Sequence, residues 1–132
     1  MILKCVAGAS IYGICAYGDQ MIEDEAKKCY AKDKKMEKGV AFPTCISANN
    51  FVGHVSPLKS EDSELKEGDM VKIDLGAHID GFVGLVAHTV VVGQKEVTGI
   101  KADVILAAYN AIEASLRLMK PGNLNYQVKP FT

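Results

Sequence analysis

The chain has 132 residues, of which 15 are basic and 16 are acidic, and its formal net charge is −1. This length, with 48% hydrophobic and 23% charged residues, predicts one globular domain and excludes a disordered, collagen-like or coiled-coil chain. The near balance of charge excludes a global field that would select nucleic acid or acidic lipid, so such a partner must be met by a local patch.

The first predicted element is a helix that begins after Ser10, because serine is a residue type that caps helix N-termini. Apolar residues recur from there at spacings of three, four and seven, as one face of a helix requires. Gly18 is a candidate for a kink or a division of this helix. The apolar positions are Ile11, Ile14, Cys15, Met21, Ile22, Ala26, Cys29 and Tyr30.

Lysines gather on the polar side of this element and give residues 27–38 a local excess of four positive charges. Two interpretations stay open. Such a run is ordinarily a solvated helix face, and less often an electrostatic footprint for a phosphate backbone. The lysines are Lys27, Lys28, Lys32, Lys34, Lys35 and Lys38, which stand against Asp33 and Glu37.

The helical period disappears in the next segment, where extended structure is predicted. Residues 40–47 (VAFPTCIS) and 51–57 (FVGHVSP) are interpreted as two short extended segments joined by a turn at 48–50. Pro43 predicts an edge position or a bulge. Residues 60–69 hold five acids and one lysine and are typical of a surface loop.

A strand pair and a second helix are predicted next. Residues 70–76 (MVKIDLG) and 82–93 (FVGLVAHTVVVG) are rich in β-branched and apolar residues and predict an antiparallel pair with its turn at Asp80-Gly81. Apolar residues at helical spacing from Val104 to Met119 predict a helix that lies on the sheet and stops at residues 120–122 (KPG).

The order of helix, consecutive strands and helix indicates the α+β class, in which helices pack on a largely antiparallel sheet. The whole of residues 1–132 is predicted to be a single domain. Both of its ends are expected to be truncated, because the last ten residues lead toward a further element and Met1 falls where a helix is already under way.

Two further kinds of protein are excluded by the pattern of apolar residues and cysteines. No apolar run approaches the roughly 18 to 20 residues that a membrane-spanning helix needs, so no membrane partner is expected. The four cysteines include no CxxC pair and fit neither a zinc site nor a dense disulfide scaffold, so reduced thiols are expected. They are Cys5, Cys15, Cys29 and Cys45.

One carboxylate, Asp74, lies inside an apolar predicted strand, where it is costly unless it is paired, hydrogen-bonded or bound to a metal. Three histidines, His54, His78 and His88, surround it in the sequence. Surface or structural roles are favoured for His78 and His88, because nothing in the sequence positions them together. No phosphate-binding glycine loop, nucleophile elbow or histidine pair at helical spacing is present.

Four segments of the sequence carry a resemblance to a known family. They are AFPTCISANN, FVGHVSPLKS, KEGDMVKIDLGAHIDGFVGLVAHTVVV and VTGIKADVILAAYNAIEASLRLMKPGN. These segments resemble the pita-bread fold of methionine aminopeptidases, and more closely their non-catalytic relatives, the proliferation-associated protein family. The resemblance runs from Leu3 to Val128 and implies the N-terminal half of that fold.

The resemblance also implies what the site contains. In the catalytic members, two metal ions about 3.5 to 4 Å apart need bridging carboxylates, one in the KID motif and one eleven positions on. The first position is Asp74, but the second is Leu85, which cannot ligate a metal, and the remaining ligands would lie beyond Thr132. His54 matches the substrate-binding histidine, although a histidine satisfied by backbone groups is an equal interpretation. Asp80 is rejected as a substitute ligand because it belongs to the predicted hairpin turn.

We therefore expect a vestigial cleft formed by His54, Asp74 and Leu85, with no catalytic residue, no metal and no cofactor. The resemblance implies a non-enzymatic protein of the cytoplasm and nucleus that binds RNA or the ribosome, and also regulatory proteins, and that regulates translation and cell growth. The alternative is a truncated metal-dependent methionine aminopeptidase, which removes N-terminal methionine.

Two further expectations concern partners. The lysine-rich segment predicts weak, salt-sensitive and shape-dependent contact with structured RNA, because lysine attracts phosphate without base specificity. A homodimer is expected through the apolar face that truncation would expose.

Overall fold

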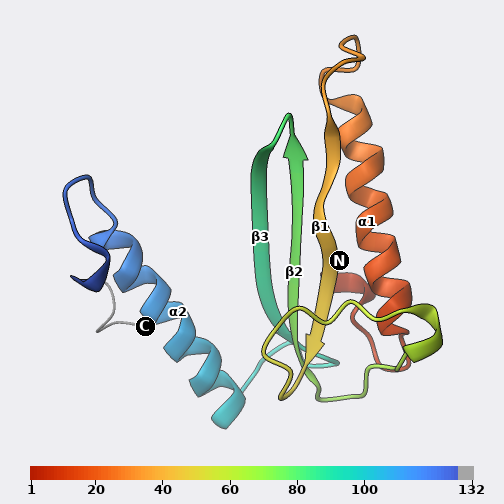
Figure 1. Cartoon of the computed structure of the whole chain (residues 1–132). Helices are drawn as coiled ribbons and strands as arrows, with labels where there is room; N and C mark the ends of the chain where they lie inside the picture. Colours follow the sequence, from red (N-terminus) through yellow and green to blue (C-terminus); the bar gives the residue numbers. More distant parts are fainter. Residues whose placement is uncertain (128–132) are drawn as a thin grey trace. The chain divides into compact units, whose positions relative to one another are not determined.

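The computed structural model of the chain describes residues 1–127, in two compact units: Met1–Gln94 and a second that begins at Lys95. The first unit holds helix α1 (Ile11–Lys28) and strands β1 (Lys38–Ala48), β2 (Met70–Ile79) and β3 (Phe82–Val91), and the second holds helix α2 (Ile100–Leu118) (Figure 1). Single 3₁₀ turns lie at Ile2–Lys4, Lys59–Glu61 and Asn125–Gln127. The predicted α+β class is confirmed, and the single domain stays a prediction.

The three strands form one antiparallel sheet in the order β1-β2-β3. Strands β2 and β3 are joined by Asp80 and Gly81, whose φ angles of 51° and 81° are both left-handed, as the two-residue type I′ hairpin turn requires. This confirms the predicted turn. The pairing of β1 with β2 shifts register on either side of Phe42, so the irregularity that Pro43 predicts is also confirmed.

Helix α1 packs on β1 and β2 and buries one face against the sheet. Ser10 caps its N-terminus, because the Ser10 hydroxyl accepts the N–H of Gly13 at 2.8 Å, as predicted. The core contains one stripe of α1 and the residues of the sheet and of the following loop that face it. They include Ile11, Ile14, Cys15, Ile46, Leu65, Val71, Ile73 and Val92.

Gly18 does not divide the helix, which runs through it without a break, so the predicted division is wrong. A Cβ atom at Gly18 would lie 2.7 Å from Oγ1 and 2.8 Å from Cγ2 of Thr44 on β1. Glycine is needed here because the backbone of α1 approaches this strand closely.

Helix α1 ends at Lys28, earlier than the apolar pattern predicts. Cys29 is extended, with ψ of 132°, and Tyr30 has a left-handed φ of 46°, so the helical hydrogen bonds cannot continue. Lys32, Lys34 and Lys35 therefore lie on the loop between α1 and β1. Only the first two lysines of the cluster lie on a helix, and the interpretation of the whole run as a helix face is wrong.

Residues 51–57, predicted as a short extended segment, do not form a strand. Ile46 N–H donates to Val55 O at 2.8 Å, and Val55 N–H donates to the Ser47 hydroxyl at 3.3 Å, but no regular ladder follows. Gly53 precedes His54, whose φ of 62° lies in the left-handed region, and a strand cannot pass through such a residue. The segment is an extended loop beside β1.

The acidic residues 60–69 are irregular apart from part of one 3₁₀ turn, as predicted for a surface loop. The loop is held in two places. Leu65 is 1% exposed and belongs to the core, and Asp62 accepts the hydroxyl of Ser10 and, at 2.9 Å, the N–H of Tyr12. The loop therefore supports the N-terminus of α1.

In the second unit, α2 ends at Leu118 and is followed by Met119, whose N–H bonds back to the carbonyls of Leu116 and Ser115. The helix and its stop are confirmed, whereas its packing on the sheet stays a prediction. Within residues 1–127, neither helix combines the length and the apolar character that crossing a bilayer demands.

Candidate functional site

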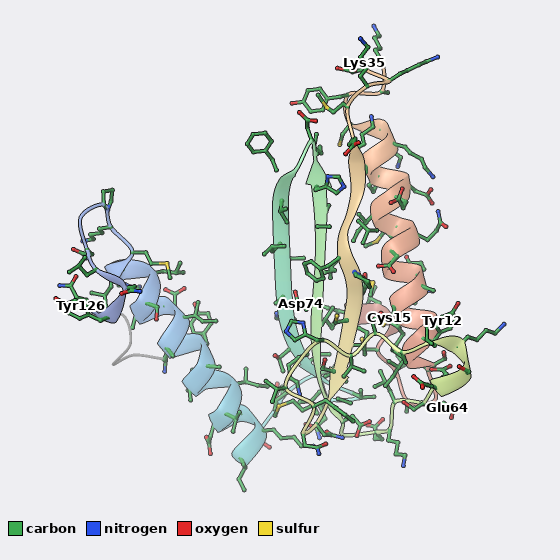
Figure 2. All side chains as sticks on the ribbon, viewed as in Figure 1. Tyr12, Cys15, Lys35, Glu64, Asp74 and Tyr126 are labelled. Atoms are coloured by element: carbon green, nitrogen blue, oxygen red, sulfur yellow. The ribbon has the colours of Figure 1, made fainter. Side chains whose placement is uncertain are left out.

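Asp74 lies near the middle of β2, on the sheet face opposite α1. It alternates along the strand with Ile73, which is buried in the core that includes α1, so its side chain points to the other face (Figure 2). A hollow of about 490 Å³ opens there, which we call the Asp74 hollow. Its lining residues are Phe42, Pro43, Cys45, His54, Ser56, Asp74 and Leu85.

Leu85 comes into this hollow from β3. It pairs with Gly76, which lies two residues beyond Asp74 on β2, so both side chains share one face. A Cβ atom at Gly76 would lie 2.8 Å from Cδ2 of Leu85 and 2.6 Å from Cε1 of Phe42. The absence of a side chain at Gly76 therefore makes room for a leucine and an aromatic ring, which give the hollow an apolar wall.

His54 reaches the hollow from the loop that follows β1. It is exposed, and its left-handed φ of 62° is uncommon for a residue with a side chain. The structure thus brings together His54, Asp74 and Leu85, the three residues of the predicted cleft. Their interpretation as a vestigial substrate cleft stays a prediction.

Two buried thiols lie near this site. Burial raises the pKa of Cys45, and the negative charge of Asp74, its partner on β2, raises it further. Burial also raises the pKa of the Cys15 thiol on α1 to about 11. Because the thiolate is the form that attacks electrophiles, the raised pKa makes each thiol a weaker nucleophile than an exposed cysteine.

The residues of the Asp74 hollow do not fit a two-metal centre. Two adjacent cations need several bridging anionic oxygens, and the hollow has one carboxylate, one thiol, one histidine and an apolar wall. In the part of the chain that the structure describes, no three side chains of histidine, cysteine, aspartate or glutamate gather closely enough to hold a metal ion.

The other histidines and Asp80 lie outside this hollow. His78 belongs to β2, and its Nδ1 accepts the N–H of Gly81 at 3.4 Å, which supports the hairpin turn. His88 pairs with Ile73 from β3 and is exposed. Asp80 is exposed at the turn itself, so its rejection as a ligand agrees with its position.

The predicted lysine cluster separates into three groups. Lys27 and Lys28 form ion pairs with Asp24 and Glu25 on α1, with N–O distances of 3.2 and 2.6 Å. Lys38 donates to the backbone carbonyls of Cys29 and Tyr30 and so fastens the loop.

Lys32, Lys34 and Lys35 form the third group, which we call the tip lysines. They are exposed on the loop between α1 and β1, at the same end of the sheet as the β2-β3 turn (Figure 2). No acidic side chain within residues 1–127 forms an ion pair with them. The tip lysines are therefore the members of the cluster whose ammonium groups are available to phosphate.

Sequence reasoning missed two residues beside this loop. A second hollow brings Tyr30 together with His78 and Phe82, whereas the sequence pattern placed Tyr30 among the apolar positions of the first helix and assigned no site role to Phe82. Phe82 follows the predicted turn Asp80-Gly81 directly, and its place at the hairpin tip was the available signal.

An antiparallel sheet covered by a helix on one face, with a carboxylate of its middle strand on the other, defines an α+β domain with a polar group on its uncovered face. The model of metallopeptidase family M24 matches residues 5–129, and the chain belongs to this family. The pita-bread fold expected from the resemblance is thereby confirmed.

Similar proteins agree with this assignment. Proliferation-associated protein A of Dictyostelium discoideum is 53% identical over 131 residues, which are 97% of this chain and 34% of that protein. The curved DNA-binding protein of Schizosaccharomyces pombe is 53% identical over 127 residues, 94% of this chain and 33% of that one. The solved structure of a thermophilic Arx1 matches with a TM-score of 0.80 and 35% identity, over 96% of this chain and 37% of that one. The chain spans about a third of the length of these curated relatives.

Proposed function

We propose that the chain is a non-enzymatic member of family M24 that binds RNA, and through it the ribosome, and acts with regulatory proteins to control translation and cell growth in the cytoplasm and nucleus. The observation that carries the RNA contact is the group of tip lysines, which have no ion pairs within residues 1–127. The names of two relatives, one proliferation-associated and one DNA-binding, support a growth-related and nucleic-acid-binding role.

Leu85 supports the proposal that the chain does not hydrolyse peptides. Its side chain shares a face with Asp74 and packs over Gly76 with Phe42, so hydrocarbon occupies the space between the two strands. Leu85 therefore supplies no second bridging carboxylate at this position, which supports a binding role for the hollow.

The expected RNA affinity is modest. Asp24 and Glu25 offset the charges of Lys27 and Lys28, and an excess of two positive charges remains in residues 29–38. Each phosphate contact made by a lysine releases counterions and makes binding salt-dependent, with a slope near −0.7 per contact for single strands. Three contacts therefore predict that affinity falls about twentyfold between roughly 50 and 200 mM salt.

This is tested by titrating the protein with a structured RNA at those two salt concentrations. The variant Lys32→Glu/Lys34→Glu/Lys35→Glu is compared with Lys59→Glu/Lys66→Glu/Lys95→Glu, which changes the net charge equally at exposed positions elsewhere. We expect the first variant to lose about tenfold or more in affinity and most of the salt slope, and the second to lose little. Affinity that is unchanged by salt, or that falls equally in both variants, would remove the tip lysines from the proposal.

The alternative, a metal-dependent methionine aminopeptidase, has in its favour the family to which the chain belongs and the carboxylate of Asp74. An assay with cobalt or manganese and a methionyl peptide separates the two functions. We expect no turnover above the blank for the protein as it stands. Turnover that disappears in Asp74→Asn would show that the chain is an enzyme and contradict the proposal.

A further inference from the structure

The hollow beside the tip lysines is lined by two exposed aromatic residues. It has a volume of about 450 Å³, within the range of small-molecule sites. Ala77 and Gly84 face each other across β2 and β3 and line it with little bulk, while Tyr30 and Phe82 contribute rings. A Cβ atom at Gly84 would meet no atom within 4 Å, so the space above this glycine is open. We call this the Tyr30-Phe82 hollow.

Tyr30 is held in place by its backbone. Its carbonyl accepts the ammonium group of Lys38 at 3.2 Å and the N–H of Asp33 at 3.0 Å, and its φ of 46° fixes a left-handed bend. The residue nevertheless stays 65% exposed. A rigid backbone with an exposed ring lowers the entropy cost of stacking another flat group on that ring.

Phe82 is the most exposed of the large hydrophobic side chains on β3, at 82%. Burial of its ring therefore adds little to the stability of the first unit. The residue begins a regular strand directly after the type I′ turn. The turn is tied to the lysine-bearing loop, because Asp80 N–H donates to the carbonyl of Glu37 at 2.6 Å. Phe82 follows the β2-β3 turn, and the tip lysines lie on the loop between α1 and β1. This turn and this loop are connected at one end of the sheet (Figure 1).

The charges at this end support only the modest RNA affinity proposed above. Three carboxylates, Asp33, Glu37 and Asp80, lie among the same two turns, although Asp33 accepts the backbone N–H of Lys35 at 3.0 Å. Stacking of a base on an aromatic ring adds about 1 to 3 kcal/mol per base and does not depend on salt. An aromatic hollow next to exposed lysines supplies both contributions.

We propose that the Tyr30-Phe82 hollow stacks an unpaired base of single-stranded RNA, while the phosphates on either side of that base contact the tip lysines. This inference rests on the proposed RNA-binding function and specifies its substrate as an unpaired segment rather than a duplex. His78 lines the same hollow. Its Nδ1 accepts the Gly81 N–H at 3.4 Å and so supports the turn that precedes Phe82.

The test uses an eight-nucleotide single strand with one 2-aminopurine, whose fluorescence reports stacking, and a hairpin duplex with the same number of phosphates. Tyr30→Leu and Phe82→Leu remove the rings but keep apolar bulk, and Phe51→Leu is the matched control, because Phe51 is also exposed, at 59%, but does not line the hollow. Gly84→Val fills the open space with a residue that strands favour.

We expect Tyr30→Leu, Phe82→Leu and Gly84→Val each to weaken single-strand binding by about fivefold to a hundredfold, to abolish the 2-aminopurine signal and to leave the salt slope unchanged. Phe51→Leu and Tyr30→Phe should bind as the unmodified protein does. Urea unfolding of each variant shows that the fold is retained.

Three results would overturn the inference. The first is ring variants that bind normally while the tip-lysine variant is weakened, which would leave the proposed function intact. The second is tighter binding of the duplex than of the single strand. The third is that poly-glutamate binds as tightly as the RNA and is weakened equally by Tyr30→Leu and Phe82→Leu. That result would indicate an acidic protein as the partner. Insensitivity to both ring and lysine variants would instead reject the proposed function itself.

Discussion

Thr44 carries a hydroxyl that is buried and unpartnered among the described residues. The side chain is fully buried on β1 beside Gly18 of α1, and its Oγ1 forms no hydrogen bond. A buried polar atom without a partner costs more than a methyl group in the same place. We predict that Thr44→Val raises the free energy of unfolding by about 1 kcal/mol, measured by urea denaturation.

The matched control for this change is Ser47→Ala on the same strand. The Ser47 side chain is also buried, but its Oγ accepts the N–H of Val55 at 3.3 Å. Its removal leaves that N–H unpaired and should lower the free energy of unfolding by about 1 kcal/mol. A Thr44→Val protein that is less stable than the unmodified one would show that the hydroxyl is satisfied in solution.

At the scale of elements, the N-terminus of α1 depends on a carboxylate from a distant loop. Two hydrogen bonds hold the pKa of Asp62 below its ordinary value. The larger effect comes from the Ser10 hydroxyl and the smaller from the Tyr12 N–H. Because the folded-state pKa is the lower one, this carboxylate stabilises the fold above the unfolded pKa, near 4, and its contribution is lost as the pH falls through the folded pKa. We predict that Asp62→Asn lowers stability at pH 7 and reduces the loss of stability on acidification.

The measurement is the midpoint of urea unfolding at pH 7 and at pH 3 for the unmodified protein, Asp62→Asn and Glu61→Gln. Glu61→Gln, the neighbouring change, is the control, because it removes an exposed acid that makes no capping bond to α1. The difference between the two midpoints should shrink in Asp62→Asn and stay near its original value in Glu61→Gln. Equal differences in all three proteins would show that Asp62 does not cap the helix.

The elements that the sequence predicts well are those set by local chemistry. The Asp80-Gly81 turn fixes the register of β2 and β3, and that register alone brings Leu85 onto the face of Asp74. The end of α1 was predicted too late, because apolar spacing does not report the left-handed backbone at Tyr30. The Tyr30-Phe82 hollow was missed for a similar reason: it depends on how the loop after α1 meets the hairpin, through bonds between residues far apart in sequence.

At the scale of the whole molecule, β3 presents an apolar edge. It pairs with β2 on one side, and in the described sheet no strand lies on its other side. Large side chains along it are exposed: Phe82 by 82%, Val83 by 55%, Leu85 by 67% and Val86 by 58%. An open strand edge with apolar side chains is a template for pairing with another strand.

We propose that a second copy of the chain covers this edge, because two β3 strands can pair antiparallel about a twofold axis, as a symmetric dimer requires. Light scattering should show the average mass rising with concentration from 14.2 kDa toward twice that value. Leu85→Lys/Val86→Lys should keep the protein monomeric, whereas Val52→Lys, at a 93% exposed position away from β3, should not. A constant mass of 14.2 kDa across the micromolar range would reject pairing through β3. Equal dimerisation of both variants would reject it too, because lysines on β3 repel a second copy only if the two β3 strands meet.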